Sequence, residues 1–177
     1  MLTESHQNYF ELLGLPQKFA VDSTVLDQNY RRLQSEVHPD RFAAASSAER
    51  LRSMQLATEA NEAYRTLKNP TTRARYLLQL HGMEANEESN TVMPAEFLML
   101  QMEWRESIEE AKAEHDVAAL EKLLRKAQQE ARNLQENLGS MLDGRDQLDD
   151  AAESVRKLSF IDKICSDIEQ DILKLED

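Results

Sequence analysis

The tripeptide His38-Pro39-Asp40 is the part of this 177-residue chain whose residue types could do chemistry. It interrupts a helical pattern inside the stretch SEVHPDRF, residues 35–42. Proline donates no backbone hydrogen bond and disfavours the α conformation in the residue before it, so a helix must end here. An imidazole and a carboxylate beside a backbone that proline fixes could also form a pre-organised contact for another protein. The tripeptide is therefore either a helix stop or a binding site.

Other residues that could support catalysis or hold a metal are few. The four glycines are too widely spaced for a phosphate-binding loop, and the four histidines fit no metal-ligand spacing. A Ser-His-Asp triad has no motif behind it. Cys165 is the only cysteine, so no internal disulfide or cysteine cluster can form. We expect a protein that is not an enzyme and that carries no cofactor and no metal.

Composition and charge limit the fold and the partners. Four glycines, four prolines and 31% charged residues, with much Ala, Leu and Glu, favour an all-α protein. The net charge of −12 argues against nucleic-acid binding. Residues 1–80 have a net charge of +1 and residues 81–177 one of −13, so the halves should meet different partners. The chain has neither an apolar run of about 18 residues nor a secretion-signal pattern at its start, so we expect a cytoplasmic protein without membrane contact.

Apolar periodicity predicts the helices and two domains. In residues 1–80 we expect a short helix in YFELLGLP and an amphipathic helix from Asp22 to His38. A long helix should follow from Ser46 or Ser47 to Asn69, with its apolar positions running from Leu51 and Met54 to Leu67. A short helix from Thr71 or Thr72 to Leu80 should end this part. Residues 81–93 lack such a pattern and are a linker. In residues 94–177 we expect an antiparallel three-helix bundle with helices over 94–114, 116–138 and 147–175, Gly139 and Gly144 flanking the last turn.

The first helix of this bundle has two apolar faces. Five apolar residues at helical spacing form the predicted core stripe: Phe97, Leu100, Trp104, Ile108 and Ala111. Nearly opposite lie three more, with acidic neighbours: Leu98, Met99 and Met102, then Glu103, Glu106 and Glu110. Either the helix is buried on both sides or the second face is a protein-binding surface. We favour the binding surface, because only three helices are available. On the last helix, Phe160 also points away from the apolar stripe.

The order of features in residues 1–80 resembles the J-domain family: a short helix ending in LG, an amphipathic helix carrying Arg31 and Arg32, HPD, a long helix ending in N-P, and a short basic helix. The resemblance implies an antiparallel helical hairpin whose loop, with His38, Pro39 and Asp40, contacts a DnaK-type chaperone and stimulates its ATP hydrolysis. The positive charges of Arg31, Arg32 and Arg41 could steer this docking. Many J domains have a basic residue and an aromatic just before HPD, whereas here Glu36 and Val37 stand there, so a specialised chaperone is plausible.

The whole chain resembles the HscB family of co-chaperones in iron–sulfur cluster assembly, through the stretches NPTTRARYLLQLHG, FLMLQMEWRE and AAESVRKLSFIDK. The resemblance implies that the acidic domain binds an IscU-type cluster scaffold and delivers it to an HscA-type chaperone. Separately from the resemblance, we expect a monomer. The implied scaffold-binding residues are Leu98, Met99, Met102, Glu103, Glu106, Glu110 and Phe160; the family usually has leucine where Met102 stands. One alternative is a J-domain co-chaperone for a different client. Another is a protein that itself carries a metal or cluster, but a single cysteine argues against this.

Overall fold

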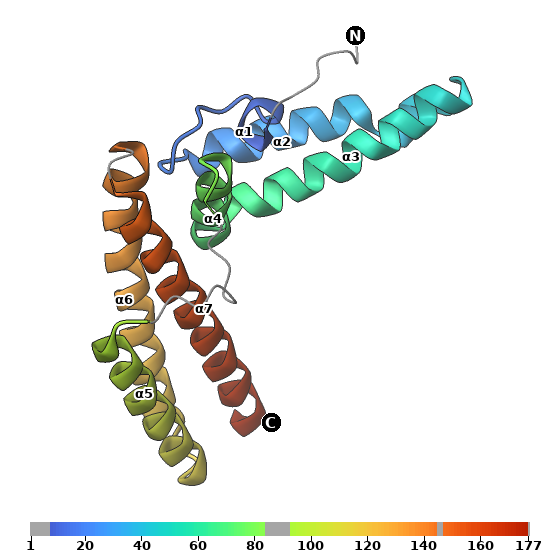
Figure 1. The fold of residues 1–177 in the computed structure, drawn as a ribbon. Coiled ribbons are helices and arrows are strands. Elements are labelled where there is room, and N and C mark those ends of the chain that lie inside the picture. Colours follow the sequence, from blue (N-terminus) through green and yellow to red (C-terminus); the bar gives the residue numbers. More distant parts are fainter. Residues whose placement is uncertain (1–7, 84–92, 145–146, 177) are drawn as a thin grey trace. The chain divides into compact units, whose positions relative to one another are not determined.

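The computed structural model describes residues 8–83, 93–144 and 147–176, and these residues form helices and no strands, which confirms the expected all-α class (Figure 1). The chain divides into two compact units, Met1–Leu77 and Leu78–Asp177. This division falls three residues before the expected domain end at Leu80, and most of the expected linker lies outside the described residues. No described helix is long and apolar enough to cross a membrane.

The first unit contains two long helices and shorter elements around them. They are α1 (Tyr9–Leu12), α2 (Ser23–Val37), the 3₁₀ turn η1 (Pro39–Phe42), α3 (Ser47–Lys68) and the start of α4 (Pro70–Leu80). The Asp22 carboxylate accepts two backbone hydrogen bonds at the start of α2, and Ser46 and Glu49 form a capping box at the start of α3. The side chain of Asn69 caps α4, which begins at Pro70, earlier than Thr71 or Thr72 as predicted.

Packing between α2 and α3 makes the predicted antiparallel hairpin. The rings of Tyr30 and Tyr64 stack with centroids 4.1 Å apart, and the hydroxyl of Tyr30 donates to Oδ1 of Asn61 at 2.7 Å. Phe10 of α1 is fully buried, and its helix packs against α3. Helix α1 therefore covers part of the hairpin (Figure 1).

Charged groups join the far end of the hairpin. Nζ of Lys68 lies 2.6 Å from Oδ1 of Asp27, which also accepts a hydrogen bond of 3.0 Å from the hydroxyl of Tyr64. These contacts lower the pKa of Asp27 below its usual value and raise that of Lys68, chiefly through the hydrogen bond between the two.

Near the turn of the hairpin, α3 buries a serine in place of the apolar residues that were predicted to be buried there. Leu51 and Met54, which were expected on the apolar stripe, are each 58% exposed. Ser53 is fully buried instead, and its Oγ donates a 2.6 Å hydrogen bond to the carbonyl oxygen of Val37, the last residue of α2. A helix end leaves its last carbonyls without partners inside the helix, so the serine supplies one. The stripe predicted the helix correctly but not which side chains it buries at this end.

The second unit contains α5 (Ala95–Ala113), α6 (Val117–Gly144) and α7 (Leu148–Glu176). Helix α6 runs six residues past the predicted end at Leu138, so Gly139 lies inside the helix and not in a turn. Leu138 and Leu142 are almost completely buried, and continuing the helix to bury Leu142 outweighs the roughly 1 kcal/mol that a glycine costs in a helix.

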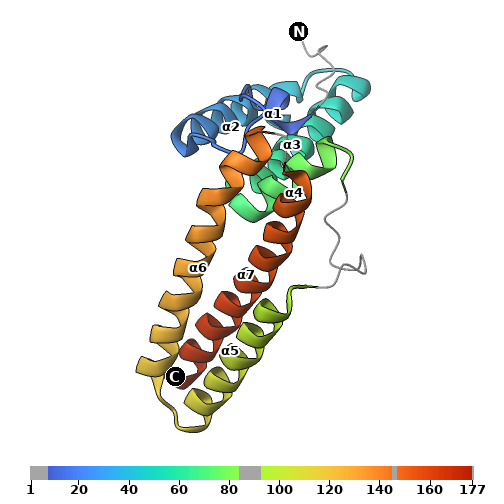
Figure 2. The ribbon, with the colours of Figure 1, turned by 60° about the vertical axis from the view of Figure 1, so that its left-hand side comes forward.

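Helices α6 and α7 lie side by side along their lengths, while the shorter α5 lies against the half of this pair nearer the C-terminus (Figures 1 and 2). The core is a continuous apolar stripe on α7 facing α6, with Val155, Leu158 and Ile161 fully buried. Around Ile108, Leu120 and Ile168 the three helices share one cluster. The predicted antiparallel bundle is therefore present, but within the described part of the chain α5 packs against two helices, α6 and α7, and buries one face.

Replacing Ser53 by alanine should destabilise the first unit, because the buried carbonyl of Val37 loses its partner. The expected loss is about 1–3 kcal/mol in the free energy of unfolding, measured by urea denaturation. Ser47→Ala, an exposed serine of the same helix without a hydrogen bond from its hydroxyl to a described residue, is the matched control and should change stability by less than about 0.5 kcal/mol. Equal effects of the two substitutions would contradict the anchoring role of Ser53.

Asp27→Asn should make the stability of the protein less dependent on acid pH. A carboxyl whose pKa is lower in the folded state stabilises the fold above its ordinary pKa of 3.8, and this contribution disappears as the pH falls through the folded value. The difference in unfolding free energy between wild type and Asp27→Asn should therefore be largest near neutral pH, begin to shrink as the pH falls towards 3.8, and vanish only below the lowered pKa of the folded state. Urea denaturation over this range measures it, with Glu136→Gln on α6 as an exposed control. A difference that stays constant with pH would contradict the pairing.

Candidate protein-binding sites

The HPD tripeptide forms the start of a 3₁₀ turn. Helix α2 ends at Val37, His38 has the extended backbone (φ −60°, ψ 129°) that a following proline favours, and Pro39 begins η1. Nδ1 of His38 accepts a hydrogen bond of 3.3 Å from the backbone N–H of Asp40 and lies 3.6 Å from a carboxylate oxygen of the same residue. The imidazole is therefore fixed by its own turn, and the tripeptide is an ordered element.

The polar groups of this turn face solvent. The side chain of His38 is 59% exposed and that of Asp40 is 92% exposed. Because Nδ1 accepts the turn hydrogen bond, the neutral imidazole carries its proton on Nε2. The turn thus offers a partner one N–H donor and one carboxylate acceptor on a backbone that is already ordered. This arrangement is suited to a contact with another protein, and a helix stop alone does not require it.

The three arginines expected beside the tripeptide are all exposed, but they are not equivalent. Arg31 and Arg32 lie on the solvent side of α2. Arg41 in η1 donates from Nη1 to the carbonyl oxygen of Ser35 at 3.1 Å. Arg41 therefore holds the turn against the last residues of α2, whereas Arg31 and Arg32 leave their charges available for long-range attraction.

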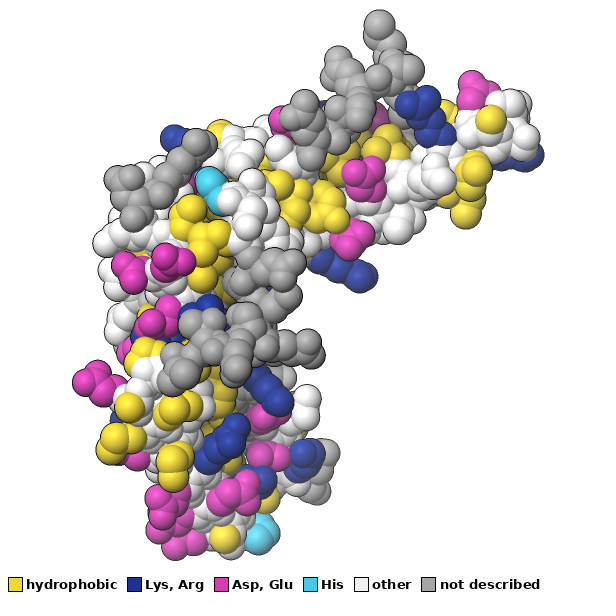
Figure 3. Space-filling model, viewed as in Figure 1, with side chains coloured by type: hydrophobic (Ala, Val, Ile, Leu, Met, Phe, Trp, Pro, Cys, Tyr) yellow, Lys and Arg dark blue, Asp and Glu magenta, His cyan; other side chains and the backbone are white. Residues whose placement is uncertain are grey.

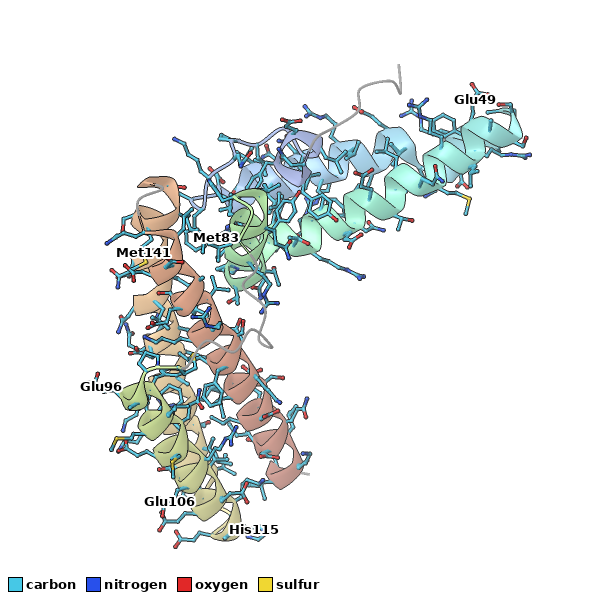
Figure 4. The ribbon with its side chains drawn as sticks, in the orientation of Figure 1. Glu49, Met83, Glu96, Glu106, His115 and Met141 are labelled. Atoms are coloured by element: carbon cyan, nitrogen blue, oxygen red, sulfur yellow. The ribbon has the colours of Figure 1, made fainter. Side chains whose placement is uncertain are left out.

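The second apolar face of α5 is exposed. Leu98 is 43% exposed, Met99 63% and Met102 71%, so the alternative in which α5 is buried on both sides is wrong. Acidic side chains follow along the same side of the helix: Glu103, Glu106 and Glu110, all exposed. Figure 3 shows yellow side chains gathered over the first half of α5 and magenta ones over its second half. In Figure 4, Glu96 and Glu106 point away from α6 and α7. We call the surface of Leu98, Met99 and Met102 the α5 face.

Phe160, which lies off the apolar stripe of α7, packs against α5. It is half-buried, its ring meets that of Phe97 edge to face with centroids 5.7 Å apart, and the guanidinium of Arg105 lies 5.8 Å from the centre of its ring. Arg105 follows Leu98 by two helical turns and so lies on the same side of α5. This contact brings Phe160 to the edge of the α5 face. The contact between Arg105 and Phe160 was not predicted from the sequence, although the seven-residue spacing from Leu98 could have placed Arg105 on this side of α5.

A groove of about 750 Å³ between α5 and α7 was also missed. Its apolar part is formed by Ile108, Phe160 and Ile164, and charged side chains surround it. Helices α5 and α7 touch each other less than either touches α6, which leaves this space. A helical wheel shows which residues share one face of a helix, but not how closely two helices approach, so the sequence could not predict the groove.

The described residues do not suggest a catalytic or metal site. Cys165 is half-buried, and burial together with Asp162 and Glu169 raises the pKa of its thiol to about 11, so it is a packing residue and a poor nucleophile. Among the residues that the structure describes, no three His, Cys, Asp or Glu side chains come together as metal ligands would. Both candidate sites are surfaces suited to binding other proteins.

Two protein-family models match the chain in the expected order. Residues 8–76 match the DnaJ domain, and residues 93–169 match the HSCB C-terminal oligomerisation domain. The first match contains the HPD turn, and the second contains the α5 face, Phe160 and most of the residues that line the groove. The two matches fall in different compact units.

Whole-chain comparisons agree with the family models. The "Co-chaperone protein HscB homolog" of Burkholderia multivorans is 51% identical over 99% of this chain and 98% of its own length. Among solved structures, "Chaperone HscB from Vibrio cholerae" is 40% identical with a TM-score of 0.83 over 96% of this chain and 99% of that one. Human co-chaperone protein HscB is 32% identical with a TM-score of 0.87, over 95% and 83%. The chain therefore belongs to the HscB family of J-domain co-chaperones, which are not enzymes.

Proposed function

We propose that this protein binds an IscU-type iron–sulfur cluster scaffold through its second unit, delivers it to a DnaK-type chaperone of the HscA kind through its first unit, and stimulates the ATPase of that chaperone. Membership of the HscB family supports this role along the whole chain. One observation carries the assignment of sites. The HPD turn exposes an ordered imidazole and carboxylate, and the α5 face, in the other unit, exposes large apolar side chains that a fold would ordinarily bury.

The HPD turn is suited to the chaperone contact. His38 and Asp40 present a donor and an acceptor. The turn is already ordered by its own hydrogen bond, so binding loses less conformational entropy. Arg31 and Arg32 add positive charge on the adjacent helix, which would speed association with an acidic surface. Arg41 contributes by keeping the turn in place.

The α5 face is suited to the scaffold contact. Exposed methionines adapt to the shape of a partner, and burying such a side chain completely stabilises a complex by about 1.5–3 kcal/mol. Phe160 adds an aromatic ring at the edge, and Glu103, Glu106 and Glu110 form an acidic border. An apolar centre with a charged border is the usual arrangement of a protein interface.

Two separate sites on one chain explain how an adaptor works without chemistry of its own. A scaffold held on the second unit is confined near any chaperone that the first unit contacts, so the second binding step takes place at a high effective concentration. Two modest affinities then produce an efficient transfer. A cytoplasmic location and a monomeric state remain predictions from the sequence; the matched family model carries the word oligomerisation in its description.

His38→Gln should abolish stimulation of the ATPase. Steady-state ATP hydrolysis by an HscA-type chaperone would be measured with and without the scaffold. Losing a central polar contact weakens docking by more than about tenfold. The matched control is His115→Asn, which changes an exposed histidine in the second unit that has φ 54°, a conformation that asparagine tolerates. Full stimulation by His38→Gln would mean that HPD serves only as a helix stop.

Met99→Ala/Met102→Ala should weaken scaffold binding by about 10- to 100-fold, because two exposed apolar contacts are lost. Isothermal titration calorimetry with an IscU-type scaffold measures this. Leu173→Ala is the control, since Leu173 is 63% exposed in the same unit but lies away from the α5 face. The double variant should keep the scaffold-independent part of the ATPase stimulation. If wild type binds no scaffold but still stimulates the chaperone, the protein serves a different client.

A further inference from the structure

The groove between α5 and α7 has a local charge opposite to that of the domain around it. Residues 81–177 have a net charge of −13, yet five basic and three acidic side chains line the groove. At one end Lys112 pairs with Glu109 and with Asp171, at 3.0 and 3.3 Å, and Lys174 pairs with Asp171 at 3.0 Å. These pairs neutralise the charges at that end.

The other end, around Phe160, holds cations without acidic partners. Arg105 of α5 and Arg156 and Lys163 of α7 line the groove there and form no ion pair with any described residue. Asp167, one turn beyond Lys163, is the one lining carboxylate outside the paired end. Figure 3 shows dark blue side chains between α5 and α7 beside the yellow ones of α5. An excess of positive charge is thus concentrated next to an aromatic ring.

Arg156 makes the arrangement costly for the free protein. Its Nε is buried and has no hydrogen-bond partner among the described residues. A buried donor without a partner destabilises a fold. Because Nε is enclosed, a ligand in the groove would meet the remaining nitrogens of the guanidinium, which are donors for acceptor oxygens.

The spacing of these groups defines the shape of the ligand. Arg156, Phe160 and Lys163 follow one another at intervals of four and three residues, so they share one face of α7, and the two cations are about 10 Å apart along the helix. An extended peptide covers this distance with about three residues. Carboxylates near the two ends of such a stretch would meet Arg156 and Lys163, and an apolar side chain between them would pack on Phe160.

We propose that the groove binds an extended acidic segment of the same scaffold whose body rests on the α5 face. The inference rests on the proposed function, because Phe160 lies both at the edge of the α5 face and in the groove, so one partner can reach both. The α5 face supplies apolar contact and carries an acidic border, whereas the groove supplies positive charge. Together they would select a scaffold by the position of its acidic segment as well as by its apolar surface.

The test is calorimetric binding of the IscU-type scaffold to the full-length protein carrying Arg156→Gln/Lys163→Gln. At about 50 mM salt the affinity should fall roughly tenfold, and the deficit should shrink at about 300 mM salt because screening weakens the wild-type contacts. The matched control is Lys122→Gln/Lys126→Gln, which removes the same charge from exposed positions on α6 outside the groove. It should bind as wild type does.

Thermal unfolding separates binding from folding. Because Arg156→Gln removes a buried donor without a partner, the groove variant should be at least as stable as wild type while binding the scaffold more weakly. Unchanged or tighter scaffold binding by the groove variant, or an equal loss in the α6 control, overturns the inference. If in the same experiment Met99→Ala/Met102→Ala still loses affinity, the proposed function stands without it; if wild type does not bind the scaffold, the proposed function itself fails.

Discussion

The hydrogen bond from Ser53 to the carbonyl of Val37 joins the two long helices of the first unit at the point where the chain reverses. Pro39 forces α2 to end and cannot supply a donor for the freed carbonyls, so the partner has to come from another element. Because Ser53 lies on α3, satisfying this carbonyl also fixes the HPD turn relative to α3. The stability of the hairpin and the presentation of the proposed chaperone contact therefore depend on the same buried hydroxyl.

Much of the fold follows from local rules that the sequence displays. The caps Asp22 and Ser46, the stop at Pro39 and the 3.6-residue spacing predicted the helices of the first unit to within a residue or two. Two predictions failed where burial depends on distant residues. Leu51 and Met54 are exposed because no element of the described first unit covers that side of α3, and Gly139 stays helical because Leu142 gains burial against α7.

The candidate sites were predictable to different degrees. Exposure of Leu98, Met99 and Met102 follows from counting helices, since a helix with two neighbours buries one side. The packing of Phe160 beneath Arg105 and the groove beside it depend on the distance between α5 and α7, which side-chain volumes across the whole bundle determine. Spacing along one helix contains no such information, so the contact had to be seen in the structure.

Net charge describes the second unit poorly at the scale on which a partner meets it. A charge of −13 over residues 81–177 governs solubility and long-range repulsion, but screening limits its reach to about 8–10 Å at physiological salt. Within that distance the acidic border of the α5 face and the basic end of the groove act separately on different parts of a bound protein. A partner with charge of one sign would be repelled by one of them. Only a protein that has separate basic and acidic regions on its surface can bind both. The space between α5 and α7 thus makes the bundle selective for such a partner.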